Sequence, residues 1–217
     1  MKEIFHGVWT EKGRLFTKNL VHGFRSHSEN IVKTKNGEFR EWDPYHSKPS
    51  AAIAKGLKNF PVKMKDKILY LGISSGATAS FFSDIIGSGG IIYGVEISDR
   101  SIRDLNPVAE KRKNIVPILA DSRKPQDYSW IEAVDIVYQD VAARDQSEII
   151  IRNAQQFLKK SGFAILAIKS RSINVVKPPT EVYKEELKKL GQHFEIIEKI
   201  ELDPYERDHI FLVMKFK

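Results

Sequence analysis

The chain has 217 residues, with 35 Lys and Arg against 28 Asp and Glu, which gives a formal net charge of +7. It contains no cysteine, which excludes disulfides and cysteine-ligated metals, and we predict no metal site. Hydrophobic residues at 41% and charged residues at 29% are typical of a globular protein, and no apolar run is long enough to span a bilayer. The first ten residues lack the apolar region of a signal peptide, so we expect a cytoplasmic protein that does not insert into a membrane.

The positive charge is concentrated near the start of the chain. Residues 1–60 carry 11 Lys and Arg against 6 Asp and Glu, whereas residues 61–217 carry 24 against 22. A basic lobe beside a nearly neutral one indicates a polyanionic partner such as nucleic acid. Ordinary solvated lysines would give the same count, and charge alone leaves both readings open.

A small β-rich appendage is predicted for the start of the chain. Its elements are, in order, strands at residues 8–10, 14–17 and 38–42 and a helix at residues 50–59 that leads into the main domain. The turn at residues 11–13 joins the first two strands in the manner of a hairpin. We therefore divide the chain into an appendage, residues 1–55, and a main domain, residues 56–217.

The main domain opens with a strand, a tight loop, a helix and a second strand. These elements are predicted at residues 68–71, 72–76, 78–86 and 91–95. The loop glycines Gly72 and Gly76 let the backbone approach a ligand, and Glu96 follows the second strand, twenty residues after Gly76. A carboxylate in that place can bind the two hydroxyls of a ribose, so this unit predicts a site for a nucleoside-bearing cofactor.

The loop does not contain the G-x-G-x-x-G motif of dinucleotide-binding enzymes. It also has no basic residue that could hold a pyrophosphate. A cofactor with ribose and adenine but no phosphate, such as S-adenosylmethionine, fits this loop better than a nicotinamide dinucleotide. A strand-to-helix turn that binds nothing remains the alternative.

Charged side chains recur where later strands end. Further strands are predicted at residues 115–119, 134–138 and 162–168, with helices between them. Asp121, Asp140 and Lys169 follow these strands as Glu96 follows the earlier one. Ligands of open α/β sheets bind outside the carboxyl ends of the strands, so the four side chains should converge on one crevice.

A helix at residues 180–190 and a hairpin of strands at residues 193–202 and 208–216 complete the chain. Strands that alternate with helices and end in such a hairpin indicate an α/β fold. We predict the seven-stranded, Rossmann-like fold of S-adenosylmethionine-dependent methyltransferases, in which the last strand is antiparallel.

Several segments resemble the fibrillarin family in its compact archaeal form, in the family's order and over nearly the whole chain. They are YLGISSGATAS, YGVEIS, NIVPILADSRKP, QDVA, FLKKSGFAILAIKSRSI and LDPYERDHIFLV. The resemblance implies an S-adenosylmethionine-dependent RNA 2′-O-methyltransferase, the catalytic subunit of box C/D guide-RNA particles that modify ribosomal RNA and, as a further target, transfer RNA. The implied partners are guide RNA, target RNA and a coiled-coil scaffold protein, with a kink-turn-binding ribosomal-type protein bound indirectly.

The same resemblance implies roles for individual residues. Besides the loop glycine Gly72, the cofactor site would be lined by Ala77, Thr78, Glu96, Ile97, Asp121, Ser122, Asp140, Val141, Ala142 and Ala143. The family's Lys-Asp-Lys arrangement with a fourth polar residue corresponds to Lys48, Asp140, Lys169 and His209. Methyl transfer needs in-line positioning and a group that removes or screens the hydroxyl proton, and we assign that task first to Lys169 and Asp140.

Other readings remain at this point. Lys48 could be a surface lysine beside a turn, and His209 could pair with Asp203 or Asp208 in the hairpin. A scaffold that binds RNA without chemistry would not need Asp140 and Lys169 opposite a cofactor loop. A stand-alone RNA methyltransferase and a small-molecule methyltransferase are the remaining alternatives, the second disfavoured by the basic start of the chain.

Overall fold

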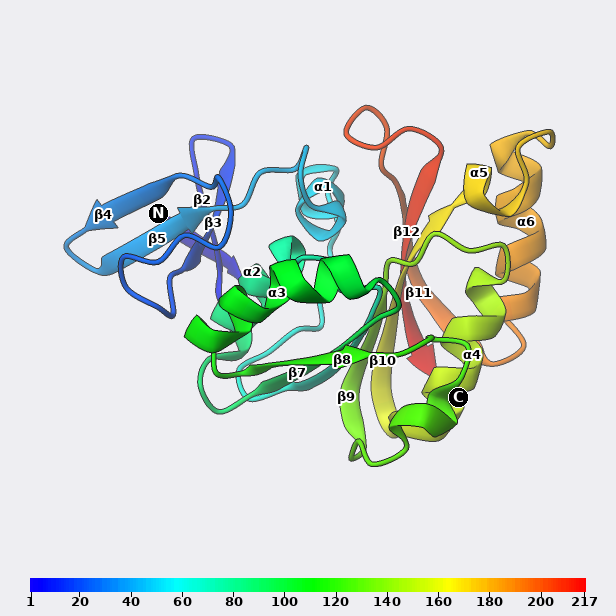
Figure 1. Ribbon diagram of the computed structural model, residues 1–217. Helices are drawn as coiled ribbons and strands as arrows, with labels where there is room; N and C mark the ends of the chain where they lie inside the picture. Colours follow the sequence, from blue (N-terminus) through cyan, green and yellow to red (C-terminus); the bar gives the residue numbers. More distant parts are fainter.

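The computed structural model describes residues 1–217 as a small antiparallel sheet beside a larger three-layer α/β domain (Figure 1). The small sheet has the strand order β1-β2-β3-β5-β4 and consists of β1 (Lys2–Phe5), β2 (Val8–Glu11), β3 (Arg14–Lys18), β4 (Ile31–Thr34) and β5 (Gly37–Glu41). The predicted hairpin is formed by β2 and β3, and the predicted third strand is β5.

The large sheet has the strand order β11-β12-β10-β9-β6-β7-β8. Its strands are β6 (Lys67–Leu71), β7 (Ile91–Glu96), β8 (Ile115–Leu119), β9 (Val134–Gln139), β10 (Leu158–Lys169), β11 (Phe194–Glu201) and β12 (His209–Phe216). Strand β12 runs antiparallel to both of its neighbours, whereas β6 to β10 pair in parallel. The predicted seven-stranded Rossmann-like methyltransferase fold with an N-terminal β-rich appendage is therefore confirmed.

Helices cover both faces of this sheet. They are α1 (Lys48–Ala54), α2 (Ala77–Ile86), α3 (Asp99–Lys111), α4 (Gln146–Phe157), α5 (Ser170–Ile173) and α6 (Pro179–Leu190), with a short 3₁₀ helix, η1 (Pro125–Tyr128). Helices α1 to α3 lie on the side that faces the small sheet, and α4 to α6 lie on the other side (Figure 1). None of these helices combines the length and the apolar character needed to cross a membrane.

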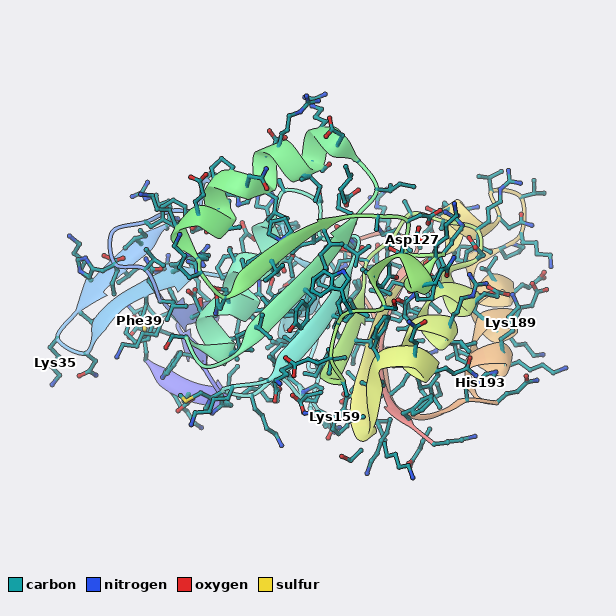
Figure 2. All side chains as sticks on the ribbon, turned by 60° about the horizontal axis from the view of Figure 1, so that its bottom comes forward. Lys35, Phe39, Asp127, Lys159, Lys189 and His193 are labelled. Atoms are coloured by element: carbon teal, nitrogen blue, oxygen red, sulfur yellow. The ribbon has the colours of Figure 1, made fainter.

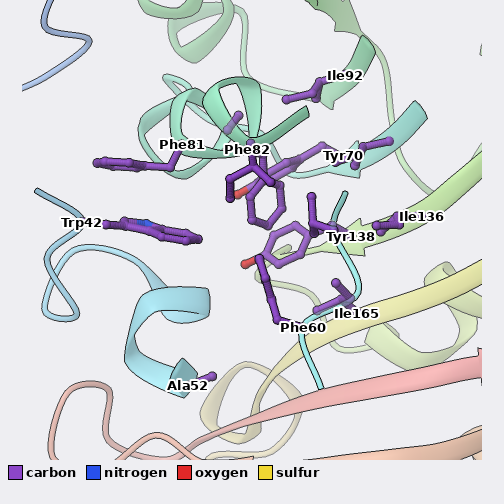
Figure 3. Packing of buried hydrophobic residues seen from close by; sticks show 14 of the residues in the cluster. Trp42, Ala52, Phe60, Tyr70, Phe81, Phe82, Ile92, Ile136, Tyr138 and Ile165 are labelled. Atoms are coloured by element: carbon purple, nitrogen blue, oxygen red, sulfur yellow. The ribbon is translucent and has the colours of Figure 1, made fainter. Parts of the chain in front are cut away.

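Alternating side chains of the central strands supply both hydrophobic cores. In β6, Ile68 and Tyr70 join the core under α2, and Leu69 and Leu71 join the core under α4, as the period of two in a strand requires. Around the first core, Trp42 is fully buried and stacks on Phe81 with ring centroids 5.3 Å apart (Figure 3). Trp42 thus packs the β5–α1 connection against α2, which ties the small sheet to the large domain.

The boundaries of two predicted elements differ from the structure by more than one residue. The helix predicted at residues 50–59 begins at Lys48 and ends at Ala54, because Pro49 suits the first turn and Gly56 adopts a φ of +95°, which a helix cannot continue. Strand β10 begins at Leu158, four residues before its predicted start. Helix α1 packs against β12, and the division of domains at residue 55 stays a prediction.

Four short elements were not predicted, namely β1, β4, η1 and α5. Each has only four residues. Edge strands β1 and β4 are mostly exposed, and their sequences show no alternation between apolar and polar residues. Their pairing with β2 and β5 is decided by tertiary contacts and not by local sequence.

A buried ionic network joins the small sheet to helices α2 and α3. The Asp84 carboxylate of α2 accepts hydrogen bonds from Arg40 at 2.7 Å, Arg112 at 2.6 Å, Thr17 at 2.7 Å and the backbone N–H of Leu20 at 2.9 Å. The side chains of Asp84, Arg40 and Arg112 are fully buried. Burial lowers the pKa of Arg112, and the nearby Asp84 carboxylate opposes that shift. Glu29 also pairs with Arg40, at 2.7 Å, so Asp84 is the one carboxylate that the two arginines share.

We expect Asp84→Asn to lower the free energy of unfolding by about 3–5 kcal/mol, because it leaves two buried guanidinium charges without their shared counter-ion. Urea denaturation followed by circular dichroism measures the change. The matched control is Asp104→Asn on the exposed surface of α3, which should change stability by less than about 0.5 kcal/mol. Equal stabilities of the two variants would contradict a supporting role of the network.

Candidate active site

The carboxyl ends of the parallel strands surround a cavity of about 320 Å³. The predicted site residues that line it are Gly72, Glu96, Ile97, Asp121, Ser122, Asp140, Val141, Ala142, Ala143 and Lys169. Four residues that the sequence did not single out also line it, namely Ser74, Ser101, Arg123 and Ile149. The adjacency of β6 and β9, where the order of the strands reverses, places the cavity at the position where doubly wound sheets bind ligands.

Gly72 allows the cofactor loop to pass close to the end of β9. Its φ is +78°, a conformation that residues with a side chain rarely adopt. A Cβ at this position would lie 3.0 Å from the Cγ1 atom of Val141 and 3.2 Å from the carbonyl oxygen of Asp140. A larger residue would therefore push Asp140 away from its place at the cavity.

Most N–H groups of the loop after β6 already donate hydrogen bonds within the protein. Gly72 and Ile73 donate to the carbonyl oxygen of Val95 in β7, and Gly76 donates back into the loop. The N–H of Ser74 donates to the carboxylate of Glu96 at 2.9 Å. N–H groups that already donate within the protein are not available to bind a pyrophosphate, so the loop fits a cofactor without phosphates.

Glu96 is held in place by two backbone N–H groups. Besides Ser74, the N–H of Ser98 donates to its carboxylate at 2.9 Å, so both oxygens are oriented while each keeps a lone pair. The carboxylate lines the cavity at the end of β7, where it could accept hydrogen bonds from both hydroxyls of a ribose. The position predicted for ribose binding is therefore occupied by an oriented acceptor.

Arg123 lines the cavity, but its charge is already paired. Its guanidinium donates two hydrogen bonds to Asp145, at 2.9 and 2.8 Å, and its backbone N–H donates to Asp121 at 2.9 Å. The hydrogen bonds to Asp145 raise the pKa of Arg123. Three carboxylates, Glu96, Asp121 and Asp140, therefore face two cations, Arg123 and Lys169, and the excess negative charge favours a cationic ligand.

A row of three charged side chains lies where β9, β10 and α1 meet. Asp140 stands between the ammonium groups of Lys48, 3.1 Å from its Oδ2 atom, and Lys169, 2.8 Å from its Oδ1 atom. The Nζ of Lys169 also donates to the backbone oxygen of Asp140 at 2.8 Å. All three side chains are between 14% and 17% exposed, so Lys48 is not the surface lysine that the sequence left open. We call Lys48, Asp140 and Lys169 the charged row.

His209 lies beside the charged row. It pairs directly with Lys169 across the antiparallel strands β10 and β12. Its Nδ1 lies 2.6 Å from the backbone oxygen of Arg207 and 4.0 Å from Glu206, whose other oxygen lies 3.7 Å from Lys48. Asp208 binds Arg171 at 2.8 Å and not His209, so the alternative structural pairing with Asp208 is not formed. With Nδ1 bonded to the Arg207 oxygen, Nε2 is the ring nitrogen for which no partner within the protein is found.

Ala77 and Thr78, which the sequence places at the cofactor site, do not line this cavity. They begin α2, and Ala77 lines a separate cavity of about 350 Å³ between α2 and the small sheet. The Thr78 hydroxyl lies 2.9 Å from the hydroxyl of Ser47, the residue before Lys48. In this structure Thr78 therefore connects the cofactor loop to the start of α1, and its cofactor contact stays a prediction.

Two tyrosines under the charged row are unsuited to proton transfer. Tyr70 of β6 and Tyr138 of β9 lie side by side, with ring centroids 4.5 Å apart (Figure 3). Burial raises the pKa of both phenols well above the usual value, and the charge of Asp140 adds to the effect. Both therefore remain neutral, which leaves proton handling to other side chains at this edge of the sheet.

The geometry is that of a methyltransferase, and comparison with known proteins decides the family. A family model described as Fibrillarin matches residues 1–217. The chain belongs to the fibrillarin family. The match covers the full extent of the sequence, and the family prediction is confirmed.

Relatives in this family agree with that assignment. The chain is 48% identical over 203 residues to the fibrillarin-like rRNA/tRNA 2′-O-methyltransferase of Pyrococcus furiosus, covering 93% of this chain and 89% of the relative. It is similar to the crystal structure of Aeropyrum pernix fibrillarin with natively bound S-adenosyl-L-methionine, with 50% identity, a TM-score of 0.87 and coverage of 93% and 88%. It also matches a chain of a fibrillarin/Nop5p complex, with 38% identity, a TM-score of 0.91 and full coverage of both chains.

We expect Glu96→Ala to weaken the binding of S-adenosylmethionine by roughly 1.5–3 kcal/mol, because a charge-assisted bond to two ribose hydroxyls is lost. Isothermal titration calorimetry measures the affinity. Glu110→Ala, on the exposed surface of α3, is the matched control and should bind like the wild type. An unchanged affinity in Glu96→Ala would remove Glu96 from the cofactor site.

Proposed function

We propose that the chain is an RNA 2′-O-methyltransferase that uses S-adenosylmethionine. The observation that carries this proposal is the charged row, two members of which, Asp140 and Lys169, line a cavity with an excess of carboxylates. The name of the Pyrococcus furiosus relative and the cofactor bound in the Aeropyrum pernix structure support the same activity and the same cofactor. Ribosomal RNA and transfer RNA are the proposed substrates.

Different residues that line the cavity would bind different parts of the cofactor. Glu96 would hold the ribose, and Asp121 with Ser122 lies at the end of β8, next along the sheet. Ile97 is 63% exposed and offers an apolar surface beside Glu96, which suits an adenine ring. Asp140 to Ala143 close the opposite side. When bound, S-adenosylmethionine supplies an electrophilic methyl group on a cationic sulfur.

The charged row would orient and activate the ribose hydroxyl. Each ammonium group has three donors, and Lys169 uses one of them on the backbone oxygen of Asp140, so donors remain for the substrate oxygen. Negative charge develops on that oxygen as its proton leaves, and two fixed ammonium groups can stabilise it without reorganisation. Asp140 holds both ammonium groups in place. Lys169 is our first candidate for the group that handles the proton: as an ammonium group it would screen the negative charge on the oxygen, and only as a neutral amine could it take up the proton itself.

Selection of the target nucleotide would come from other molecules. The chain folds into one methyltransferase domain and one small sheet, with no separate module for reading a base sequence. A-form RNA exposes its 2′-hydroxyls along a wide, shallow minor groove, so an open site can reach one in a guide–target duplex. We therefore propose that this chain binds a protein partner similar to Nop5p and acts with a box C/D guide RNA. A kink-turn-binding protein would be bound indirectly.

We expect Lys169→Ala to lower single-turnover methylation by about 100-fold or more, the scale usual for a proton-handling or charge-screening group. Binding of S-adenosylmethionine should stay within a few-fold of the wild type. The matched control is Lys159→Ala, which removes a lysine from the opposite end of the same strand, where it pairs with Asp135 (Figure 2). A wild-type rate of Lys169→Ala in the assembled particle would refute the assignment.

We expect the purified chain to bind S-adenosylmethionine but to methylate free RNA slowly, with full activity only when guide RNA and partner proteins are added. The measurement compares rates on one guide–target duplex, with the partners supplied singly and together. Equal, site-specific rates without partners would favour a stand-alone RNA methyltransferase. Binding of RNA without any methyl transfer under every condition would favour a non-catalytic scaffold.

A further inference from the structure

The backbone of Lys169 is bound by a buried glutamine, Gln146, that has no part in the chemistry proposed above. Gln146 is the first residue of α4, and its side chain is fully buried. Its Oε1 atom accepts a hydrogen bond from the N–H of Lys169 at 2.9 Å, and its Nε2 atom donates to the carbonyl oxygen of Lys169 at 3.1 Å. One side-chain amide therefore satisfies both backbone groups of this lysine.

Gln146 takes the place of a neighbouring strand at this end of β10. Strand β9 ends at Gln139, and its last pair with β10 joins Gln139 to Leu166. Lys169 lies three residues farther along β10, beyond the ladder on that side. An N–H and a carbonyl left unpaired there would cost free energy and would let the end of the strand move. The Gln146 amide thus fixes the backbone from which the Lys169 side chain extends.

The same amide also holds a wall of the cofactor cavity. Its Nε2 atom donates to the carbonyl oxygen of Ala143 at 2.8 Å, and Ala143 lines the cavity together with Val141 and Ala142. The two hydrogens of Nε2 are therefore both used, one on Ala143 and one on Lys169. A single group sets the position of Lys169 and of the segment that faces the cofactor.

The position of Gln146 is fixed from both ends. The buried side chain of Gln139 donates to the backbone oxygen of Gln146 at 2.7 Å, and the three bonds of the Gln146 amide fix the other end. A carboxylate of the same length could accept the N–H of Lys169, but it has no hydrogen for the two carbonyl oxygens. The arrangement therefore requires an amide at this position.

We propose that Gln146 is a positioning residue for methyl transfer, which places Lys169 against Asp140 and the substrate hydroxyl and holds Ala143 against the cofactor. This inference rests on the proposed RNA methylation and deepens it. Gln146 does not line the cavity, so its effect on the rate is exerted through Lys169. A misplacement of about 1 Å is enough to lower a rate by about 100-fold.

The test combines two substitutions in the reconstituted particle. We expect Gln146→Met, which keeps the length of the side chain but not its hydrogen bonds, to lower the single-turnover methylation rate at saturating S-adenosylmethionine about tenfold or more. The affinity for the cofactor should fall severalfold, because Ala143 is no longer held. The double variant Gln146→Met/Lys169→Ala should stay within about twofold of Lys169→Ala, because a residue that acts through Lys169 then has nothing to position.

The matched control is Ser147→Ala, at the next position of α4. Ser147 is also fully buried, and the substitution also removes a hydrogen bond, but this bond leads to Glu186 of α6 and away from the site. Thermal unfolding measures the stability of both variants. We expect both Gln146→Met and Ser147→Ala to lose stability, and only Gln146→Met to lose methylation rate.

Three outcomes would overturn the proposal. A wild-type rate of Gln146→Met would show that Lys169 does not need the glutamine. A double variant that is slower than Lys169→Ala by the full factor of Gln146→Met would show that the two residues act independently. An equal loss of rate in Ser147→Ala would mean that Gln146 only stabilises the fold.

A second measurement does not depend on methyl transfer. Exchange of the Lys169 amide hydrogen, followed by NMR, reports whether its N–H stays bonded, and Ile165 in the middle of β10 is the internal reference. We expect Gln146→Met to raise the ratio of the exchange rates at Lys169 and Ile165 about tenfold, because one hydrogen bond is lost at Lys169 only. An unchanged ratio would overturn the proposal. A wild-type particle that never methylates RNA would refute the proposed function, and the exchange rates would still decide whether Gln146 holds Lys169.

Discussion

The contact on which the site depends is that of Asp140 with two ammonium groups from distant parts of the chain. Lys169 continues β10, which neighbours β9 in the sheet, but Lys48 comes from α1, more than ninety residues before Asp140 in sequence. A mostly buried carboxylate between two lysines is far more stable than any of the three charges alone in the same place. The charged row therefore fixes the position of α1 over the ends of the strands.

Two further polar contacts hold the same junction from the side of the small sheet. Asp84 joins Arg40 of β5 to Arg112 at the end of α3, and the Ser47–Thr78 bond joins the start of α1 to the start of α2. Helix α2 follows the cofactor loop directly, and Ser47 directly precedes Lys48. A movement of that loop would therefore be transmitted to Lys48 through the hydrogen bond between the Ser47 and Thr78 hydroxyls. The small sheet thus acts as a support that places one end of the charged row, while the large sheet places the other.

Much of the site could be predicted because strand ends are readable in sequence. Glu96, Asp121, Asp140 and Lys169 each follow an apolar run, and parallel topology brings such ends together. Arg123 could not be recognised in this way, because an arginine in a polar loop is usually a solvated side chain and only its bonds to Asp145 place it at the cavity. The position of Thr78 was also hidden, since the sequence cannot show which way the first turn of α2 faces.

The sequence by itself determined the order of the large elements, the phosphate-free character of the loop and the family, because periodicity, glycine placement and motif spacing are local properties. Only the tertiary structure decided that Lys48 pairs with Asp140, that His209 stands opposite Lys169, and that Tyr45 meets Tyr205. Each of these contacts joins segments that are far apart in the chain. Their formation depends on the packing of α1 and of the β11–β12 loop against the sheet, which local sequence preferences do not predict.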